Sequence, residues 1–428
     1  MIVEFKIKNF RSYKEETTFT FEALDENFKS ENYTIVELEN GESIKLLKSA
    51  AIFGANASGK SNIIWAFQAL SSLVAQSRNF DARTPIPVYT PFIMDEKTRN
   101  QPTEFSIDFI IKKKRYRYII HFDYIIRLEA LYMIVQEEEV CVFKMDGETN
   151  PDKRSLTLGE GYQSPSLDLS NMQMLANQLI LSGMGIKPDN GLLDVYKTLA
   201  DIQAEPVGDS INLKTNNESV AANILKNSDS KLFHQLKRLI HIADMGIDDI
   251  IMQEHGESEF KFPDSVPDEV KKAVIRENKW EFGMRHRDVI LGMIYESTGT
   301  KNLFGLGARI LHILDKGGIL VYDEMNIAIH PALFQLLVSL FHSPISNPHH
   351  AQLLFTTHDA SIAGNSMLRA DQIWFAEKEK DGASQLYSAQ DFDDISINLP
   401  FENWYRSGRF GALPQFGNIN YIFNNEKQ

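Results

Sequence analysis

The chain has 428 residues, of which 43% are hydrophobic and 24% charged, and this composition excludes an intrinsically disordered protein. Its 58 acidic residues outnumber its 44 basic residues, and the formal charge of −14 excludes a polybasic nucleic-acid binder of the histone kind while leaving room for a local basic groove. The single cysteine, Cys141, excludes an intramolecular disulfide and a zinc site built from several cysteines, which favours a reducing compartment.

The N-terminus predicts a strand, because apolar Val3, Phe5 and Ile7 alternate with charged residues. Such alternation differs from the continuous apolar run of a signal peptide. No segment approaches 18 uninterrupted apolar residues, so we predict no membrane span. We expect a cytoplasmic protein.

A complete G-x-x-x-x-G-K-S phosphate loop (Walker A motif) occupies residues 54–61, between an apolar strand at 50–53 and a helix with apolar residues at helical spacing. Glycines let the backbone wrap closely around an anion, and the N–H groups at the helix start attract it. Lys60 is predicted to reach the β- and γ-phosphates and the Ser61 hydroxyl to hold Mg²⁺. The predicted nucleotide-binding residues of this loop are Gly54, Asn56, Ser58, Gly59, Lys60, Ser61 and Asn62.

The next segment predicts a β-hairpin, since residues 105–111 and 116–122 each alternate apolar and polar side chains. The basic turn at 112–114 could touch nucleic acid, but a solvated hairpin tip is the favoured interpretation.

Residues 165–245 change character, with helical spacing in Leu232, Leu236, Leu239 and Ile240. Residues 246–284 are polar and predicted to be irregular, and apolar strands and helices resume from Asp288. We therefore predict an N-terminal lobe at 1–165, a mainly helical insertion at 166–285 and a C-terminal lobe at 286–428.

Three short motifs lie in the C-terminal part of the chain. A Ser-Thr-Gly-Thr sequence at 297–300 precedes a predicted helix, where hydroxyls and a glycine suit either an anion site or an ordinary N-cap. An apolar strand at 319–322 ends in two acids, of which Asp323 is predicted to bind Mg²⁺ and Glu324 to polarise the attacking water. A second apolar strand, 353–356, is followed by His358, which we expect to help position that water and so count with Glu324 as catalytic.

In this order the motifs resemble those of the ABC-type ATPases of the SMC, Rad50, RecF and OLD group. The resemblance implies an α/β P-loop ATPase head with two lobes and a central insertion. It also implies ATP and Mg²⁺ as cofactors and a homodimer that clamps ATP between its subunits. Ser297 and Gly299 match the shortened signature that contacts the nucleotide of the second subunit. Arg11, in the Asn-Phe-Arg-Ser element at 9–12, matches a residue expected near the nucleotide.

A closer resemblance is to the standalone RloA-like and AbiL-like ATPases of bacterial phage defence, which usually act beside a separate effector protein. It rests on residues 89–92 (Tyr-Thr-Pro-Phe), 243–247 (Ala-Asp-Met-Gly-Ile), 371–375 (Asp-Gln-Ile-Trp-Phe) and 407–411 (Ser-Gly-Arg-Phe-Gly). The resemblance implies antiviral defence, with no nuclease module in this chain.

Two departures from the family pattern stand out. The loop after Glu324 has Asn326 where the family usually has an acid and Ile327 where it has a polar residue, although His330 and Pro331 are kept. Residues 91–92 are Pro-Phe where related proteins place a glutamine linked to Mg²⁺, so that role has no assigned residue.

We therefore expect an ATPase that converts ATP and water to ADP and phosphate and controls a separate effector in an abortive-infection system. The alternatives are a DNA-repair ATPase of the RecF or Rad50 type and an ATP-binding scaffold with negligible turnover. A transporter ATPase is disfavoured because no coupling membrane segment is present, and a GTPase because no Asn-Lys-x-Asp element is found.

Overall fold

The computed structural model describes residues 1–147, 155–162, 174–186, 191–206, 213–226, 230–244, 246–263, 265–364, 367–392 and 401–413. Contacts divide the chain into two compact units. Unit 1 comprises Met1–Pro206, Val321–Glu324 and Gln352–Gln428, and unit 2 comprises Val207–Leu320 and Met325–Ala351. Each unit therefore joins segments that are distant in the sequence. The three predicted ranges stay a prediction, and the boundary after residue 165 lies outside the described residues.

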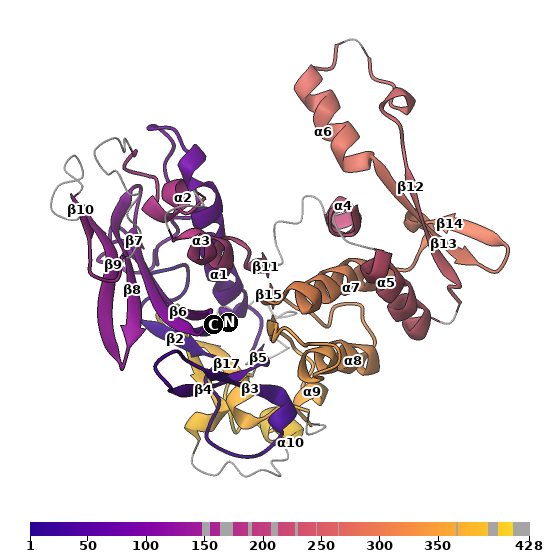
Figure 1. Cartoon of the computed structure of the whole chain (residues 1–428). Coiled ribbons are helices and arrows are strands. Elements are labelled where there is room, and N and C mark those ends of the chain that lie inside the picture. The colour runs from indigo at the N-terminus through magenta and orange to yellow at the C-terminus, as the bar shows by residue number, and fades with distance from the viewer. Residues whose placement is uncertain are drawn as a thin grey trace, which may run out of the picture. The chain divides into compact units, whose positions relative to one another are not determined.

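The first sheet of unit 1 has seven strands in the order β10-β9-β8-β7-β6-β1-β2, each paired antiparallel with its neighbour (Figure 1). Their bounds are β1 Ile2–Lys8, β2 Thr17–Thr20, β6 Thr103–Ile111, β7 Lys114–Phe122, β8 Ile126–Val135, β9 Glu138–Asp146 and β10 Ser155–Leu158. The predicted alternation is confirmed in β1, where Val3, Phe5 and Ile7 are buried.

The predicted hairpin is confirmed as β6 and β7. Its two-residue turn, Lys112 and Lys113, has φ of 48° and 67°. This left-handed pair matches the twist of the strands. Asn-Gly is the usual sequence for this geometry, and here two lysines adopt it. Lys112 pairs with Asp194 at this solvated tip.

The second sheet of unit 1 has the order β11-β15-β16-β5-β17-β18, with a separate two-stranded sheet formed by β3 and β4. The bounds are β3 Tyr33–Glu37, β4 Ser43–Leu47, β5 Ser49–Phe53, β11 Gln203–Glu205, β15 Ile319–Tyr322, β16 Gln352–Thr356, β17 Ile373–Lys378 and β18 Ser384–Ser388. Strand β5 is parallel to both β16 and β17, and all five of its residues are buried, as expected for the centre of a sheet covered on both faces.

Helix α1, Lys60–Gln76, follows β5 and has buried apolar residues around most of its circumference. A helix that is apolar on several sides requires packing partners on each of them. One partner is the seven-stranded sheet, where the rings of Phe67 and Phe5 lie 4.5 Å apart, and another is β11 of the six-stranded sheet. The remaining helices of this unit are α2 Ile180–Met184, α3 Leu193–Ala200, α9 Ser361–Gly364 and α10 Phe401–Arg406.

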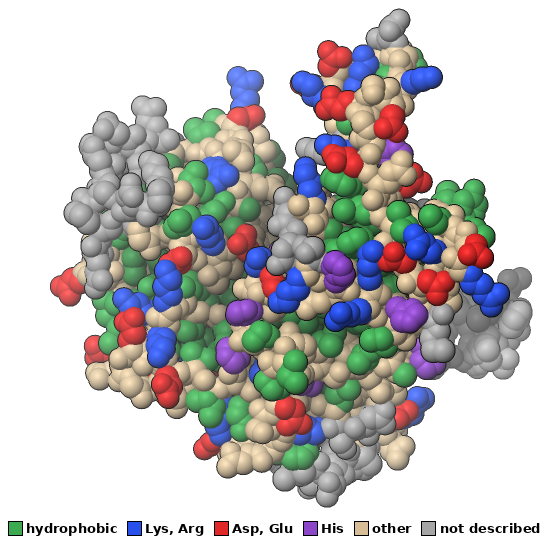
Figure 2. Space-filling view, turned by 45° about the vertical axis from the view of Figure 1, so that its right-hand side comes forward, with side chains coloured by type: hydrophobic (Ala, Val, Ile, Leu, Met, Phe, Trp, Pro, Cys, Tyr) green, Lys and Arg blue, Asp and Glu red, His purple; other side chains and the backbone are tan. Residues whose placement is uncertain are grey.

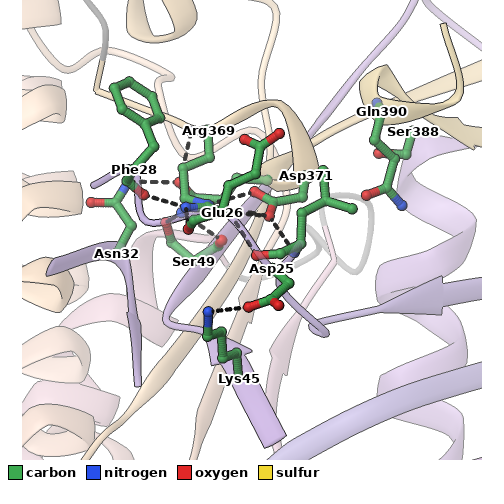
Figure 3. A network of polar contacts seen from close by, with 12 residues as sticks. Asp25, Glu26, Phe28, Asn32, Lys45, Ser49, Arg369, Asp371, Ser388 and Gln390 are labelled. Carbon is green, nitrogen blue, oxygen red and sulfur yellow. Dashed lines mark hydrogen bonds and ion pairs between the residues drawn. The ribbon is translucent and has the colours of Figure 1, made fainter. Parts of the chain in front are cut away.

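A buried ion pair fixes the start of β17. Arg369 is 3% and Asp371 2% exposed, and their side chains pair at 2.7 Å. Figure 3 shows the Arg369 guanidinium also reaching the backbone carbonyl oxygens of Glu26 and Phe28, and the Asp371 carboxylate accepts a hydrogen bond from the Leu24 N–H (2.8 Å). These contacts hold an N-terminal segment against the loop that enters β17, about 340 residues later.

Unit 2 contains α4 Leu213–Lys226, α5 Ser230–Ala243, β12 Asp249–Glu254, α6 Asp268–Asn278, β13 Trp280–His286, β14 Val289–Gly292, α7 Thr298–Lys316 and α8 Pro331–His342. Both α4 and α5 pack on α7, and β12, β13 and β14 form an antiparallel sheet. The helix predicted around Leu232–Ile240 is confirmed as α5.

The prediction that residues 246–284 are irregular is wrong. They contain β12, α6 and the first part of β13. The segment is polar because α6 keeps acidic and basic side chains exposed, as Asp268, Glu269 and Lys272 illustrate. Figure 2 shows red and blue side chains interspersed at the top of the view, where α6 lies. Two acids, Asp268 and Glu269, lie beside Lys271 and Lys272 in α6, and this mixture of charges does not make a basic patch suited to nucleic acid.

The α/β class predicted from the sequence is confirmed by these parallel and antiparallel sheets and their covering helices. Within the described residues, no helix combines the length and apolar character required to cross a membrane.

Candidate functional site

The phosphate loop lies between β5 and α1 in unit 1, and its backbone turns through left-handed conformations. Gly54, Ala57 and Gly59 have φ of 153°, 61° and 107°. A Cβ at Gly54 would lie 2.3 Å from the Ala376 carbonyl oxygen, so a side chain does not fit there. At Gly54 and Gly59 only glycine adopts the observed φ beside neighbouring backbone at little cost. The loop leads directly into the N-terminus of α1, the arrangement that makes an anion cradle.

Two polar groups of the loop point to an anionic ligand. Ser58 is 3% exposed, and its hydroxyl oxygen has no hydrogen-bond partner among the described residues. The Lys60 Nζ donates to the carbonyl oxygens of Gly54 and Ala55, at 2.9 Å each. Burial lowers the pKa of Lys60 to about 8, and the negative charges of Asp323 and Glu324 act in the opposite direction. A buried amine in a glycine-rich cradle, next to an unsatisfied hydroxyl, fits a phosphate group.

Asp323 and Glu324 follow the end of β15, beside β16 in the sheet. The Thr356 hydroxyl donates to Asp323 Oδ1 (2.6 Å) and accepts the Glu324 N–H (2.7 Å). The Asp323 N–H donates to the Glu205 carbonyl oxygen at the other side of the strand (3.1 Å). Asp323 is only 1% exposed, whereas Glu324 is partly exposed and has a φ of 48°. The two acids are therefore held in different environments by the same threonine.

His358 lies just beyond β16, with its Nε2 3.8 Å from Glu324 Oε1. Burial lowers the pKa of His358, the charge of Lys60 lowers it further, and Glu324 opposes both. A lowered pKa keeps the imidazole neutral near pH 7, able to donate one hydrogen bond and accept another. The structure thus brings Lys60, Asp323, Glu324 and His358 together in unit 1.

The loop containing Arg11 lies beside α1. The Arg11 guanidinium lies over the ring of Trp65, 4.2 Å from its centre, a cation–π contact. The Arg11 N–H donates to the Thr90 carbonyl oxygen (2.7 Å), and the Phe92 N–H donates to the Asn9 side chain (3.0 Å). The Pro-Phe segment that had no assigned role therefore supports the Arg11 loop. Sequence analysis missed Trp65, whose only signal is a large aromatic side chain one turn after the phosphate loop.

The Ser-Thr-Gly-Thr sequence lies in unit 2, where Ser297 is the N-cap of α7. Its hydroxyl accepts the Thr300 N–H at 3.1 Å. A Cβ at Gly299 would lie 2.7 Å from the Ala328 carbonyl oxygen, so glycine is required by close backbone approach. These contacts are compatible with an ordinary N-cap and with an anion site, because both use the exposed N-terminus of a helix.

The loop that departs from the family pattern packs on this helix start. The Asn302 side chain donates to the Ile327 carbonyl oxygen (3.3 Å), and Ala328 has a φ of 57°. His330 caps α8 by accepting the Ala332 N–H at its Nδ1 (3.2 Å), and Pro331 occupies the first helical position. His330 and Pro331 therefore serve α8, while Ile327 is 44% exposed.

Thr356 is the principal site residue that sequence analysis missed. It ends the largely apolar strand β16, and this sequence context indicates only a core position. The structure shows it fully buried. Among the described residues, no three or more His, Cys, Asp or Glu side chains gather in a way that could hold a metal ion.

Comparisons with known proteins agree with a nucleotide site. The family described as "AAA domain, putative AbiEii toxin, Type IV TA system" matches residues 49–156 and 186–363, more than half of the chain. No curated protein matches the chain.

Three solved structures of SMC heads are similar to the chain. An SMC head bound to the C-terminal winged-helix domain of ScpA is 14% identical with a TM-score of 0.47, covering 90% of this chain and 97% of its own. The SMC head domain of Thermotoga maritima is 12% identical with a TM-score of 0.40, covering 90% and 98%. The Pyrococcus furiosus SMC head with an extended coiled coil, bound to the C-terminal domain of ScpA, is 13% identical with a TM-score of 0.44, covering 90% and 96%.

The phosphate loop, the strand that ends in Asp323 and the histidine after β16 all lie within the residues that the family model matches. The chain accordingly belongs to the AAA-domain family that carries the description "putative AbiEii toxin, Type IV TA system".

Proposed function

We propose that this protein binds ATP with Mg²⁺ and hydrolyses the ATP to ADP and phosphate. The observation that carries the proposal is the convergence of the phosphate loop, a buried lysine and two differently held carboxylates at one edge of a sheet. A buried lysine whose pKa is lowered in the free protein gains a strong partner when a triphosphate arrives. Family membership supports the same conclusion.

The residues suited to Mg²⁺ are Ser61, at the start of α1, and Asp323. Both offer oxygen atoms, which Mg²⁺ prefers, and few protein ligands suffice because phosphate oxygens and water complete its shell. The metal would supply positive charge to the phosphate oxygens. Thr356 orients the Asp323 carboxylate for this task through its hydrogen bond.

Glu324 is the proposed general base, taking the proton of the attacking water at a carboxylate oxygen. Its carboxylate is partly exposed and 3.8 Å from the neutral His358, which can orient it or the water by hydrogen bonding. Asn56, Gly59 and Asn62 complete the proposed nucleotide contacts from the loop, and Arg11 contributes from the adjacent loop that Trp65 supports.

We further propose an ATP-dependent homodimer in which Ser297 and Gly299 contact the nucleotide of the second subunit. The exposed N-terminus of α7 suits an anion. The segment just before it exposes large apolar side chains, with Val289 and Ile290 each 55% exposed and Ile294 and Tyr295 each 77%. Apolar exposure on this scale is typical of a surface that meets another protein.

The biological role that we propose is control of a separate effector in anti-phage defence. The family description, which names a putative AbiEii toxin, and the resemblance to RloA-like and AbiL-like proteins support it. Because ATP clamped between two subunits favours one assembly state, nucleotide binding can switch the effector on or off. The alternatives are a DNA-repair ATPase and a scaffold that binds ATP with negligible turnover.

Binding and turnover are tested by calorimetry and phosphate release. Lys60→Ala should abolish detectable ATP binding. The control Lys48→Ala removes another buried lysine, whose Nζ donates to the Glu31 carbonyl oxygen, and should keep ATP binding. Glu324→Gln should bind ATP normally and hydrolyse it roughly 10²–10⁴ times more slowly. Equal affinity in Lys60→Ala and the parent would refute the site, and a parent that binds ATP without turnover would select the scaffold alternative.

The dimer is tested by mixing Ser297→Arg protein with Lys60→Ala protein. A heterodimer keeps one site with an intact loop and an intact signature, so part of the activity should return. If two folded, dimeric variants fail to complement each other, the signature does not act across the interface.

The biological role is tested with the native operon. Lys60→Ala should abolish phage protection without lowering protein level, and the parent should co-purify with its effector. Unchanged phage resistance after deletion, together with reduced survival of DNA damage, would select the repair alternative.

A further inference from the structure

Two carbonyl oxygens of the phosphate loop, those of Ser58 and Gly59, have hydrogen-bond partners in distant parts of the chain. For the loop N–H groups to converge on an anion, its carbonyl groups must point away and find donors elsewhere, because buried backbone groups are almost always paired. The Ser384 hydroxyl, on β18, lies 2.7 Å from the Ser58 carbonyl oxygen. The Tyr13 hydroxyl lies 3.2 Å from the Gly59 carbonyl oxygen.

Ser384 is also linked to the first turn of α1. Its hydroxyl is 2.7 Å from the Ser12 hydroxyl, which accepts a hydrogen bond from the Asn62 side-chain amide (2.6 Å). A carbonyl oxygen only accepts hydrogen bonds and the amide NH₂ group only donates them, which fixes the donor at each step. Asn62 donates to Ser12, Ser12 donates to Ser384, and Ser384 donates to the Ser58 carbonyl oxygen. Each hydroxyl both donates and accepts once in this chain, so the arrangement is fully satisfied.

The packing around this chain is close. Ser384 is 5% exposed and Tyr13 is completely buried. A Cβ at Gly59 would lie 2.3 Å from the Ser384 hydroxyl and 2.9 Å from that of Ser12. The second glycine of the loop is therefore required not only by its φ of 107° but also by the approach of these two hydroxyls.

We propose that Ser384 is a positioning residue of the nucleotide site, holding the phosphate loop in its anion-binding shape with the help of Ser12 and Tyr13. This inference rests on the proposed ATP binding. Its physical basis is preorganisation: a loop already held in the binding conformation spends less interaction energy on ordering when the triphosphate arrives. The Ser384 N–H also donates to the Ser12 carbonyl oxygen (2.7 Å), so β18 and the segment at 9–12 support the loop together.

The test compares Ser384→Ala with Ser388→Ala. Ser388 is a buried serine on the same strand whose hydroxyl contacts the Ile373 carbonyl (3.3 Å), away from the loop. We expect Ser384→Ala to raise the Kd for ATP roughly tenfold and Ser388→Ala to change it less than twofold, the former figure corresponding to one buried hydrogen bond. Tyr13→Phe, which removes only a hydroxyl, should raise the Kd by several-fold and serves as an independent variant if Ser384→Ala does not fold.

Hydrogen exchange supplies a readout that does not require ATP. In nucleotide-free protein, the backbone amides of residues 58–62 should exchange faster in Ser384→Ala than in the parent or in Ser388→Ala. If the parent binds no ATP, the proposed function fails, while the exchange data still decide whether Ser384 holds the loop. Parent-like ATP affinity and parent-like exchange in Ser384→Ala would overturn the inference, as would equal changes in Ser388→Ala.

Discussion

Replacing Thr356 by valine should damage the acidic end of β15 without changing the volume of the core. Thr356 is fully buried, and its hydroxyl makes two hydrogen bonds, one to the Asp323 carboxylate (2.6 Å) and one from the Glu324 N–H (2.7 Å). Valine has the same shape and neither hydrogen bond. The variant therefore separates the loss of polar contacts from the creation of a cavity.

The expected cost follows from these two contacts. A hydrogen bond to a charged group contributes about 1.5–3 kcal/mol, and leaving the Glu324 N–H poorly satisfied adds about 1 kcal/mol. We therefore expect the free energy of unfolding to fall by about 2–4 kcal/mol. Displacing Asp323, the proposed metal ligand, by about 1 Å costs on the order of 10²-fold in rate, so turnover should fall much more than ATP affinity.

Urea denaturation and steady-state phosphate release measure the two effects. Thr356→Ser, which keeps the hydroxyl, is the matched control and should retain most of the turnover despite the loss of a methyl group. If Thr356→Val is as stable and as active as Thr356→Ser, the hydroxyl does not orient Asp323 and the reasoning is refuted.

Three further predictions concern other parts of the molecule. The pKa of Lys60 is lowered to about 8 in the free protein, so ATP affinity should fall by up to tenfold per pH unit above pH 8. The free protein should gain stability as the pH rises from about 8 to 10.5, because the lysine binds more protons in the unfolded chain than in the folded one over this range. Affinity and stability that do not change with pH would contradict this. Asp371→Asn should lower the free energy of unfolding by about 3–5 kcal/mol because it leaves the buried Arg369 charge without its carboxylate. Glu402→Gln, in an exposed ion pair, should cost at most about 1 kcal/mol in the same urea experiment. Gly299→Ala should destabilise the protein, because the added Cβ would lie 2.7 Å from the Ala328 carbonyl oxygen. Gly292→Ala should not, because its Cβ would lie 3.8 Å from the nearest atom. Equal melting temperatures of the two variants would show that the loop at Ala328 moves aside freely.

Local patterns predicted much of the secondary structure. The alternation in β1, the hairpin of β6 and β7, the strand before and the helix after the phosphate loop, and the helix at 230–243 were all evident from spacing. Side-chain periodicity reflects which face of an element is buried. The same rule failed for residues 246–284. There α6 and the neighbouring strands expose charged side chains on much of their surface, so burial left little trace in the sequence.

The sequence by itself determined the chemistry that is local to a motif. Such motifs are the glycines, lysine and serine of the loop at 54–61, the acids at the end of β15 and the N-cap serine of α7. The residues of each motif are neighbours in the sequence, so their spacing alone indicates which groups lie together. Only the tertiary structure decided which distant residues support them. Thr356, Trp65, Tyr13 and Ser384 belong to no sequence motif, and their neighbours in the sequence do not reveal what their side chains contact. Their roles depend on strand order and on hydrogen bonds between residues as many as 326 positions apart, and such contacts exist only once the sheets have formed.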